Sequence, residues 1–199
     1  GTSTAGVALG RPNADSSGGV APGAKIFEAN NMGNSNNGTD EGIYKSLQYI
    51  YERRNVHKFA AVYISQGGWS PKRANYSDCS SNLQKVSELI TSLKVAGIPV
   101  LVASGNGSNT GGVNSIGCVA DAISIGAADS TTVVTNFSNI SPKVDFLAPG
   151  CSKSSDYPGK YGLFCGTSGS APIVAGAIAL LRQANPAITY DEIIATLKS

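Results

Sequence analysis

Residues 166–172 read Gly-Thr-Ser-Gly-Ser-Ala-Pro, and residues 173–181 continue as the apolar run Ile-Val-Ala-Gly-Ala-Ile-Ala-Leu-Leu. This order predicts a glycine-flanked turn that leads into a buried helix, with Pro172 in the first helical turn, where its missing N–H does no harm. Ser168 would then lie at the positive end of the helix dipole, among small residues that leave room for another molecule's backbone. The alternative is that Ser168 only caps the helix, as serine often does.

The composition is that of one domain with few charges. The 199 residues are enough to bury a substantial core. Charged residues make up 14% of the chain, against about 25% in average proteins, and the net charge of +2 is spread without any basic run. Nucleic acids and acidic membranes are therefore poor candidate partners, and no apolar stretch approaches the ~18 residues that span a bilayer. Because the chain has neither an initiator methionine nor a signal peptide, we expect it to have been processed or trimmed.

The four cysteines are spaced too widely for a C-x-x-C metal or redox motif, and a chain with one histidine is a poor candidate for a zinc site. An even number of cysteines in a chain rich in Asn, Ser and Gly fits an oxidising compartment and two disulfides. Among the three possible pairings we prefer Cys79–Cys118 with Cys151–Cys165. The second pair would close a short loop directly before the serine turn. The alternative is four buried free thiols in a cytosolic protein.

Short apolar runs alternate with amphipathic stretches along most of the chain. We expect helices at 1–10, 39–54, 82–96, 173–181 and from Thr189, and strands at 24–29, 59–65, 99–103, 122–126, 133–137 and 144–147. Gly97 should end the third helix, and Thr189 should form a capping box with Glu192. The alternation predicts an α/β fold with a doubly wound, mainly parallel sheet and helices on both faces. In such sheets functional residues gather at the carboxyl ends of the strands, where Ser65-Gln66-Gly67 and Ser104-Gly105-Asn106 fall.

Residues 166–176 match the pattern Gly-Thr-Ser-x-x-x-Pro-x-Val-Ala-Gly, which resembles the nucleophile segment of the subtilisin-like serine peptidases, or subtilases. Residues 103–106, Ala-Ser-Gly-Asn at the end of a predicted strand, resemble that family's oxyanion-asparagine segment. The resemblance implies that Ser168 is the nucleophile and that Asn106, together with the backbone N–H of Ser168, stabilises the oxyanion beside Thr167. A side-chain amide aimed at such an oxygen lowers the barrier by ~3–4 kcal/mol.

The same resemblance implies a substrate-binding edge. Ser65-Gln66-Gly67-Gly68 matches the family's Ser-x-Gly-Gly pattern and would hold extended substrate backbone, while Ala103, Ser104 and Gly105 would form the facing wall of the primary specificity pocket. Each motif alone is also a common turn sequence. Their order and spacing together favour the subtilisin-like interpretation. The pair Cys79–Cys118 is similar to an extra disulfide of some secreted bacterial members.

The resemblance covers nearly the whole chain but lacks two catalytic groups. Gly1-Thr2 resembles the helix start that follows the family's catalytic histidine, so that histidine would precede Gly1, and the aspartate would lie further upstream on an interior strand. Ser3 replaces a second histidine of the motif, and Gly169 stands where methionine is usual. His57 precedes the predicted strand at 59–65, which rises about 23 Å, whereas a general base must come within ~3 Å of its proton. We therefore expect His57 to be a surface residue.

We expect residues 1–199 to be a single subtilisin-like peptidase domain that is N-terminally incomplete and lacks the N-terminal strands. Its expected function is that of the nucleophile-bearing portion of a secreted serine endopeptidase acting on polypeptides, with histidine and aspartate supplied by an N-terminal segment or another chain. The alternative is an inactive pseudoprotease that binds peptides or serves as a scaffold. A nucleotide-binding domain is disfavoured, because residues 105–110 lack the last glycine of G-x-G-x-x-G. Family members often bind calcium near the loop matching Asn13 and Asp15, but other ligands there come partly from absent segments, so we expect no metal and no cofactor.

Overall fold

The computed structural model describes residues 1–14, 18–31, 38–66, 83–156 and 159–199. Its centre is a parallel sheet of four strands in the order β1-β2-β3-β4. These strands are β1 (Val62–Ile64), β2 (Val100–Ala103), β3 (Ile123–Ala128) and β4 (Val144–Pro149). The helices are α1 (Thr2–Leu9), α2 (Asp40–Glu52), α3 (Gln84–Val95), α4 (Thr167–Ala184) and α5 (Tyr190–Lys198). An antiparallel hairpin is formed by β5 (Cys151–Asp156) and β6 (Lys160–Cys165).

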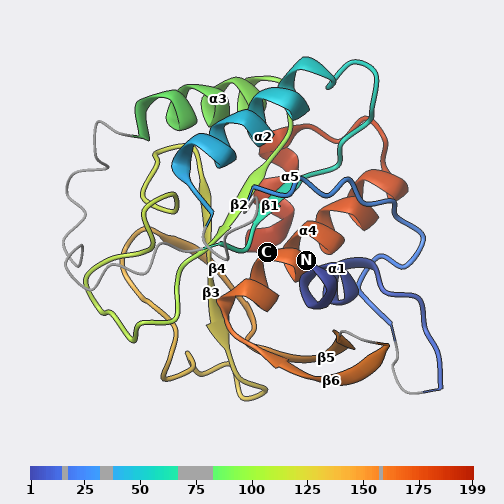
Figure 1. The fold of residues 1–199 in the computed structure, drawn as a ribbon, viewed down its shortest axis with the longest axis vertical. Coiled ribbons are helices and arrows are strands. Elements are labelled where there is room, and N and C mark those ends of the chain that lie inside the picture. The colour runs from blue at the N-terminus through green and yellow to red at the C-terminus, as the bar shows by residue number, and fades with distance from the viewer. Residues whose placement is uncertain (15–17, 32–37, 67–82, 157–158) are drawn as a thin grey trace.

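Helices cover both faces of the parallel sheet. α2 and α3 lie side by side over one face, and α4 and α5 pack on the other (Figure 1). Along β2, Val100 and Val102 join the core beneath α2 and α3, whereas Leu101 and Ala103 join the core beneath α4 and α5. This arrangement confirms the predicted doubly wound α/β fold. None of the helices in the described part of the chain is long and apolar enough to cross a membrane.

The helix ends confirm the sequence signals that predicted them. Thr39 caps α2, and its side-chain oxygen accepts a hydrogen bond from the N–H of Gly42 at 3.0 Å. Thr189 and Glu192 form a complete capping box at the start of α5. Gly97 follows α3 with a φ of +79°, a conformation that favours glycine. These local signals therefore fix where three of the helices begin or end.

Two of the predicted strands, at 24–29 and 59–65, differ from the structure. Residues 24–29 form no strand, and β1 extends only over Val62–Ile64 rather than 59–65. Within the described residues β1 pairs with β2 alone, and residues 24–29 have no strand partner, so neither segment is held along both edges. Ile26 and Phe27 are consequently 41% and 45% exposed. β1 has an apolar sequence and is half-buried along its length.

The predicted strand at 133–137 is a tight reversal of the chain instead. The carboxylate of Asp129 accepts a hydrogen bond from the N–H of Val133 at 3.1 Å, which turns the chain back directly after β3. In this described stretch the only strand-like pairing that follows is an isolated antiparallel bridge between Ala128 and Val134. The turn directed by the aspartate therefore overrides the β-propensity of the two valines.

The β5–β6 hairpin was not predicted from the sequence. Cys151 and Cys165 lie opposite each other in its register and form the expected disulfide, with a Cα–Cα distance of 4.1 Å. β5 packs against α1, and β6 delivers the chain directly to Gly166. Of the other expected pair, Cys118 is disulfide-bonded and Cys79 lies outside the described residues.

Candidate active site

The hairpin and α4 meet at Gly166, which shapes the turn before Ser168. Gly166 has a φ of +133°, which favours glycine, and its N–H donates to the carbonyl of Gly150 at 2.7 Å. A side chain at this position would also come within 3.0 Å of the Asn106 Nδ2 atom. Gly166 is the N-cap of α4, and no side chain caps this helix. Ser168 is therefore the second residue of α4, and the alternative that it serves as the cap is wrong.

Ser168 is tied to the end of β1 by a reciprocal pair of hydrogen bonds. The Ser168 hydroxyl donates to the carbonyl of Ser65 at 3.0 Å, and the Ser65 hydroxyl donates to the carbonyl of Ser168 at 2.8 Å. The second bond is possible because of Pro172. In an α-helix the N–H of residue 172 would bond to the carbonyl of residue 168, but proline has no N–H and leaves that carbonyl to Ser65. The prediction that Pro172 lies in the first turn is wrong, because it is the sixth residue of α4 counted from Thr167.

Asn106 is brought next to Ser168 by its contact with Thr167. Its Oδ1 atom accepts hydrogen bonds from both the N–H and the hydroxyl of Thr167, each at 2.9 Å. The Thr167 side chain is fully buried, and its Oγ1 also accepts from the N–H of Gly105 at 3.1 Å. Within the described residues the Asn106 Nδ2 atom has no acceptor, so the donor end of the amide is available to another molecule. A donor amide beside a serine hydroxyl can stabilise an oxyanion.

Part of the predicted substrate-binding edge adjoins Ser168. Ser65 contacts it directly, and Gln66 follows, with its Oε1 atom accepting from the side-chain amide of Asn31 at 2.7 Å. Gly67 and Gly68 lie outside the described residues. The described part of this edge therefore lies just beyond the carboxyl end of β1, where Ser65 contacts the Ser168 hydroxyl.

The segment predicted to form the facing wall, Ala103-Ser104-Gly105, is held by two asparagines to which the sequence analysis gave no role. Asn114 donates its amide to the carbonyl of Ala103, and Asn139 donates its amide to the carbonyl of Ser104 at 3.0 Å. The side chains of Ala103 and Ser104 are buried, and Gly105 is the first residue of this segment that is not. An asparagine in a polar loop carries no sequence signal of burial. Asn139 could therefore not be distinguished from a surface residue by its sequence.

No imidazole or carboxylate reaches the Ser168 hydroxyl within the described part of the chain, where its partner is the Ser65 carbonyl. His57 is exposed, as predicted, and its ring lies 5.7 Å from that of Phe59, ahead of the amino end of β1. In the loop considered for calcium, Asn13 is described and Asp15 lies outside the described residues. The described residues therefore bring a serine hydroxyl and a side-chain amide donor together without an imidazole or carboxylate beside them.

The start of α1 lies close to this site. Tyr63, on the same side of β1 as Ser65, is hydrogen-bonded to Thr4 of α1. Burial raises the pKa of the Tyr63 phenol, while the hydrogen bond with Thr4 acts in the opposite direction. Because Tyr63 is two residues from Ser65, the first turn of α1 adjoins the strand end that holds Ser168.

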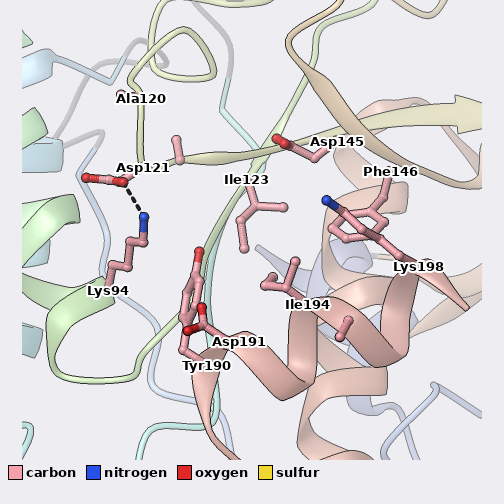
Figure 2. Close-up of a pocket in the computed structure, with 12 residues that line it drawn as sticks. Lys94, Ala120, Asp121, Ile123, Asp145, Phe146, Tyr190, Asp191, Ile194 and Lys198 are labelled. Carbon is pink, nitrogen blue, oxygen red and sulfur yellow. Dashed lines mark hydrogen bonds and ion pairs between the residues drawn. The ribbon is translucent and has the colours of Figure 1, made fainter.

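A cleft of about 430 Å³ lies at the opposite end of the sheet. Figure 2 shows it between α3, α5 and the starts of β3 and β4, with an ion pair between Lys94 and Asp121 at an N–O distance of 2.6 Å. The hydrogen bond from Lys94, together with a second from Thr91, lowers the pKa of the Asp121 carboxyl. The cleft borders Ile123 at the amino end of β3, whereas Ser168 adjoins the carboxyl end of β1. It is therefore separate from the serine site.

Known proteins match the whole length of this chain. The family model described as Subtilase family matches residues 1–199. The chain is 32% identical over 182 residues to Subtilisin Savinase from Lederbergia lenta, covering 91% of this chain and 62% of that protein. It is 30% identical over 200 residues to Alkaline elastase YaB from Bacillus sp. (strain YaB), covering 100% of this chain and 49% of that protein. The chain thus spans about half to two thirds of the length of these curated relatives.

Solved structures share the fold. A cold-adapted subtilisin-like serine proteinase is 25% identical to this chain, with a TM-score of 0.76 over 97% of this chain and 64% of its own. A structure described as S41 Psychrophilic Protease has a TM-score of 0.81 over 98% of this chain and 67% of its own. At 21% identity, the second likeness shows the fold alone.

Proposed function

Because the chain belongs to the subtilase family, we propose that it is the nucleophile-bearing portion of a secreted subtilisin-like serine endopeptidase. A peptide bond of a polypeptide substrate would be hydrolysed through an acyl-enzyme on Ser168. The observation that carries the proposal is the meeting of groups from three distant segments. The Ser168 hydroxyl lies 3.0 Å from the Ser65 carbonyl oxygen, and the Asn106 amide is anchored to the neighbouring Thr167.

In the proposed reaction, Ser168 Oγ attacks the carbonyl carbon of the scissile bond while its proton passes to a base. The negative charge that forms on the carbonyl oxygen is stabilised by the Asn106 amide and by the N–H of Ser168, which lies in the first turn of α4, where no intrahelical acceptor exists. Collapse of the tetrahedral intermediate breaks the C–N bond, and the amine leaves with the proton that the base returns. Water, deprotonated by the same base, then hydrolyses the ester and regenerates Ser168.

The proposed base is a histidine oriented by an aspartate, both supplied from outside residues 1–199. The start of α1 supports their entry at this point. Thr4 is hydrogen-bonded to Tyr63, and Tyr63 lies on the same side of β1 as Ser65. A residue just before Gly1 would therefore be near the strand end that holds Ser168.

The alternative function is that of a pseudoprotease that binds peptides or serves as a scaffold. It is favoured by the hydrogen bond that the Ser168 hydroxyl makes, because a backbone carbonyl cannot act as the base. The edge of Ser65, Gln66 and Gly67 with the wall of Ala103, Ser104 and Gly105 would serve both functions. Such an edge binds an extended peptide through main-chain hydrogen bonds and needs no catalysis.

Labelling with a fluorophosphonate probe, read by intact mass, separates the two functions. The protein would be expressed with all the residues that its gene encodes before Gly1, alongside Ser168→Ala as the control. Stoichiometric labelling that the control loses would support the endopeptidase, because only an activated serine displaces fluoride from phosphorus. Failure of the folded full-length protein to label would favour the pseudoprotease. Residues 1–199 alone are expected to remain unlabelled.

A further inference from the structure

We propose that Asn139 is a positioning residue for oxyanion stabilisation. Its side chain holds the loop at 105–109 so that the amide of Asn106 is presented to the substrate carbonyl. This inference rests on the proposed role of Asn106 and adds a residue that touches neither Ser168 nor the substrate.

The side-chain oxygen of Asn139 binds the part of the loop that follows Asn106 in the chain. Its Oδ1 atom accepts hydrogen bonds from the N–H of Gly107 at 2.9 Å and from the N–H of Asn109 at 3.1 Å. One acceptor thus holds two backbone groups that follow Asn106 in the chain. This double contact requires an oxygen at this reach from the Asn139 backbone.

Asn139 also binds the residues that precede Asn106 in the chain. Its Nδ2 atom donates to the carbonyl of Ser104 at 3.0 Å, and its backbone N–H donates to the carbonyl of Gly105 at 2.9 Å. The Ser104 hydroxyl donates to the Asn139 carbonyl at 3.1 Å. With 9% of its surface exposed, Asn139 makes these contacts from inside the protein. Both of its amide atoms are therefore used to fix the two flanks of Asn106.

The loop has no regular secondary structure that could fix it otherwise. It follows β2 with a φ of +109° at Gly105 and +54° at Ser108, so its backbone continues neither the sheet nor a helix. Backbone N–H groups in such a loop need acceptors from elsewhere. Asn106 is exposed, and its side-chain hydrogen bonds in the described residues go to Thr167. Thr167 thus holds the Asn106 side chain, and Asn139 holds the backbone that carries it.

Loss of the Asn139 side chain should affect the transition state more than the bound substrate. The oxyanion forms only as the carbonyl is attacked, so misplacing its donor lowers kcat and leaves KM nearly unchanged. A misplacement of about 1 Å can cost about 100-fold in rate. We therefore expect Asn139→Ala to lower kcat about 10- to 100-fold.

The test is a double-mutant cycle on the full-length enzyme with a chromogenic peptide substrate. It compares Asn139→Ala, Asn106→Ala and the double variant. Asn106→Ala should lower kcat about 10²- to 10³-fold, as expected for the loss of an oxyanion donor. If Asn139 acts through Asn106, adding Asn139→Ala to Asn106→Ala should lower kcat by no more than about twofold further. Asn139→Asp keeps an acceptor for Gly107 and Asn109 but cannot donate to the Ser104 carbonyl, so it should recover only part of the kcat that alanine loses.

Equal losses of kcat from Asn139→Ala in both backgrounds would overturn the inference, because they would indicate a general structural effect. Unchanged kcat in the otherwise wild-type enzyme would overturn it too. If Asn139→Ala fails to fold by circular dichroism, the cycle is run with Asn139→Ser, which fills part of the space but cannot reach the loop. If the wild-type protein does not react with the fluorophosphonate probe, the proposed function itself fails, and the inference about Asn139 falls with it.

Discussion

Replacing Thr167 with valine tests how far the site depends on one buried hydroxyl. Valine has nearly the shape of threonine but lacks the hydroxyl, and Thr167 is fully buried. The substitution removes two hydrogen bonds. The hydroxyl donates to Asn106 Oδ1 at 2.9 Å and accepts from the N–H of Gly105 at 3.1 Å. These bonds connect the start of α4 with the loop that carries Asn106.

Most of the stability lost in Thr167→Val would come from the N–H of Gly105. Its N–H would lose its acceptor in a place that is partly shielded from water, and leaving such a donor unpaired costs ~1–3 kcal/mol. Asn106 Oδ1 would keep its bond from the N–H of Thr167 at 2.9 Å, so this oxygen is not left unpaired. We therefore expect Thr167→Val to lower the free energy of unfolding by about 2 kcal/mol.

Urea unfolding of the wild type, Thr167→Val and Thr167→Ser would measure this loss. Serine keeps the hydroxyl and gives up one methyl group, a change of about 1 kcal/mol. The rate of fluorophosphonate labelling of the full-length protein should fall for valine and be retained by serine. A valine variant as stable as the serine variant, with an unchanged labelling rate, would refute the view that the hydroxyl joins Gly105 to Asn106.

Three further predictions concern stability. Replacing Cys151 and Cys165, which are 14 residues apart, with serines should lower the free energy of unfolding by about 3 kcal/mol, because the unfolded chain gains conformational entropy without the disulfide. Unchanged urea unfolding would contradict this. Thr189→Ala should cost about 1 kcal/mol in thermal unfolding through the lost cap of α5, whereas Thr189→Ser should cost much less. Asp121→Asn should lower the free energy of unfolding by less than about 1 kcal/mol near neutral pH, because Lys94 is 42% exposed and solvent screens its ion pair with Asp121. Since the pKa of Asp121 is lowered from 3.8 and that of Lys94 is raised from 10.5, their pairing stabilises the fold between these values. The contribution disappears as the pH falls through the folded pKa of Asp121 or rises through that of Lys94, so a difference from wild type that persists in acid would contradict the assignment.

The serine turn could be predicted because its signals are local. Glycine at 166 permits the positive φ, small residues surround Ser168, and an apolar run continues as α4. The loop that carries Asn106 directly follows β2, so the carboxyl-end rule for parallel sheets predicted that Asn106 and Ser65 lie at the same edge of the sheet. That Ser168 lies beside them was implied by the subtilase resemblance. The disulfide between Cys151 and Cys165 was also among the three pairings that cysteine counting allows.

Features that depend on distant partners could not be predicted. Residues 24–29 have the composition of a strand, yet a strand exists only where a neighbour accepts its hydrogen bonds. The role of Pro172 depends on the hydroxyl of Ser65, which lies more than a hundred residues earlier. Asn139 likewise acquires its position from the backbone of the loop around Asn106. In each case the deciding group belongs to another segment, so the local sequence contains no signal for it.

The described groups and the proposed external groups would divide the chemistry between them. The proposed charge stabilisation would come from residues 1–199, and a serine-protease site without its base retains about 10³- to 10⁴-fold catalysis over water. The Ser65 hydroxyl holds the carbonyl of Ser168, not its hydroxyl, so Ser168 Oγ can turn from the Ser65 carbonyl toward an incoming histidine while its backbone stays fixed. The bonds between Thr167 and Asn106 likewise involve no upstream residue. We therefore expect the upstream segment to activate a serine whose backbone geometry is already set, rather than to assemble the oxyanion site.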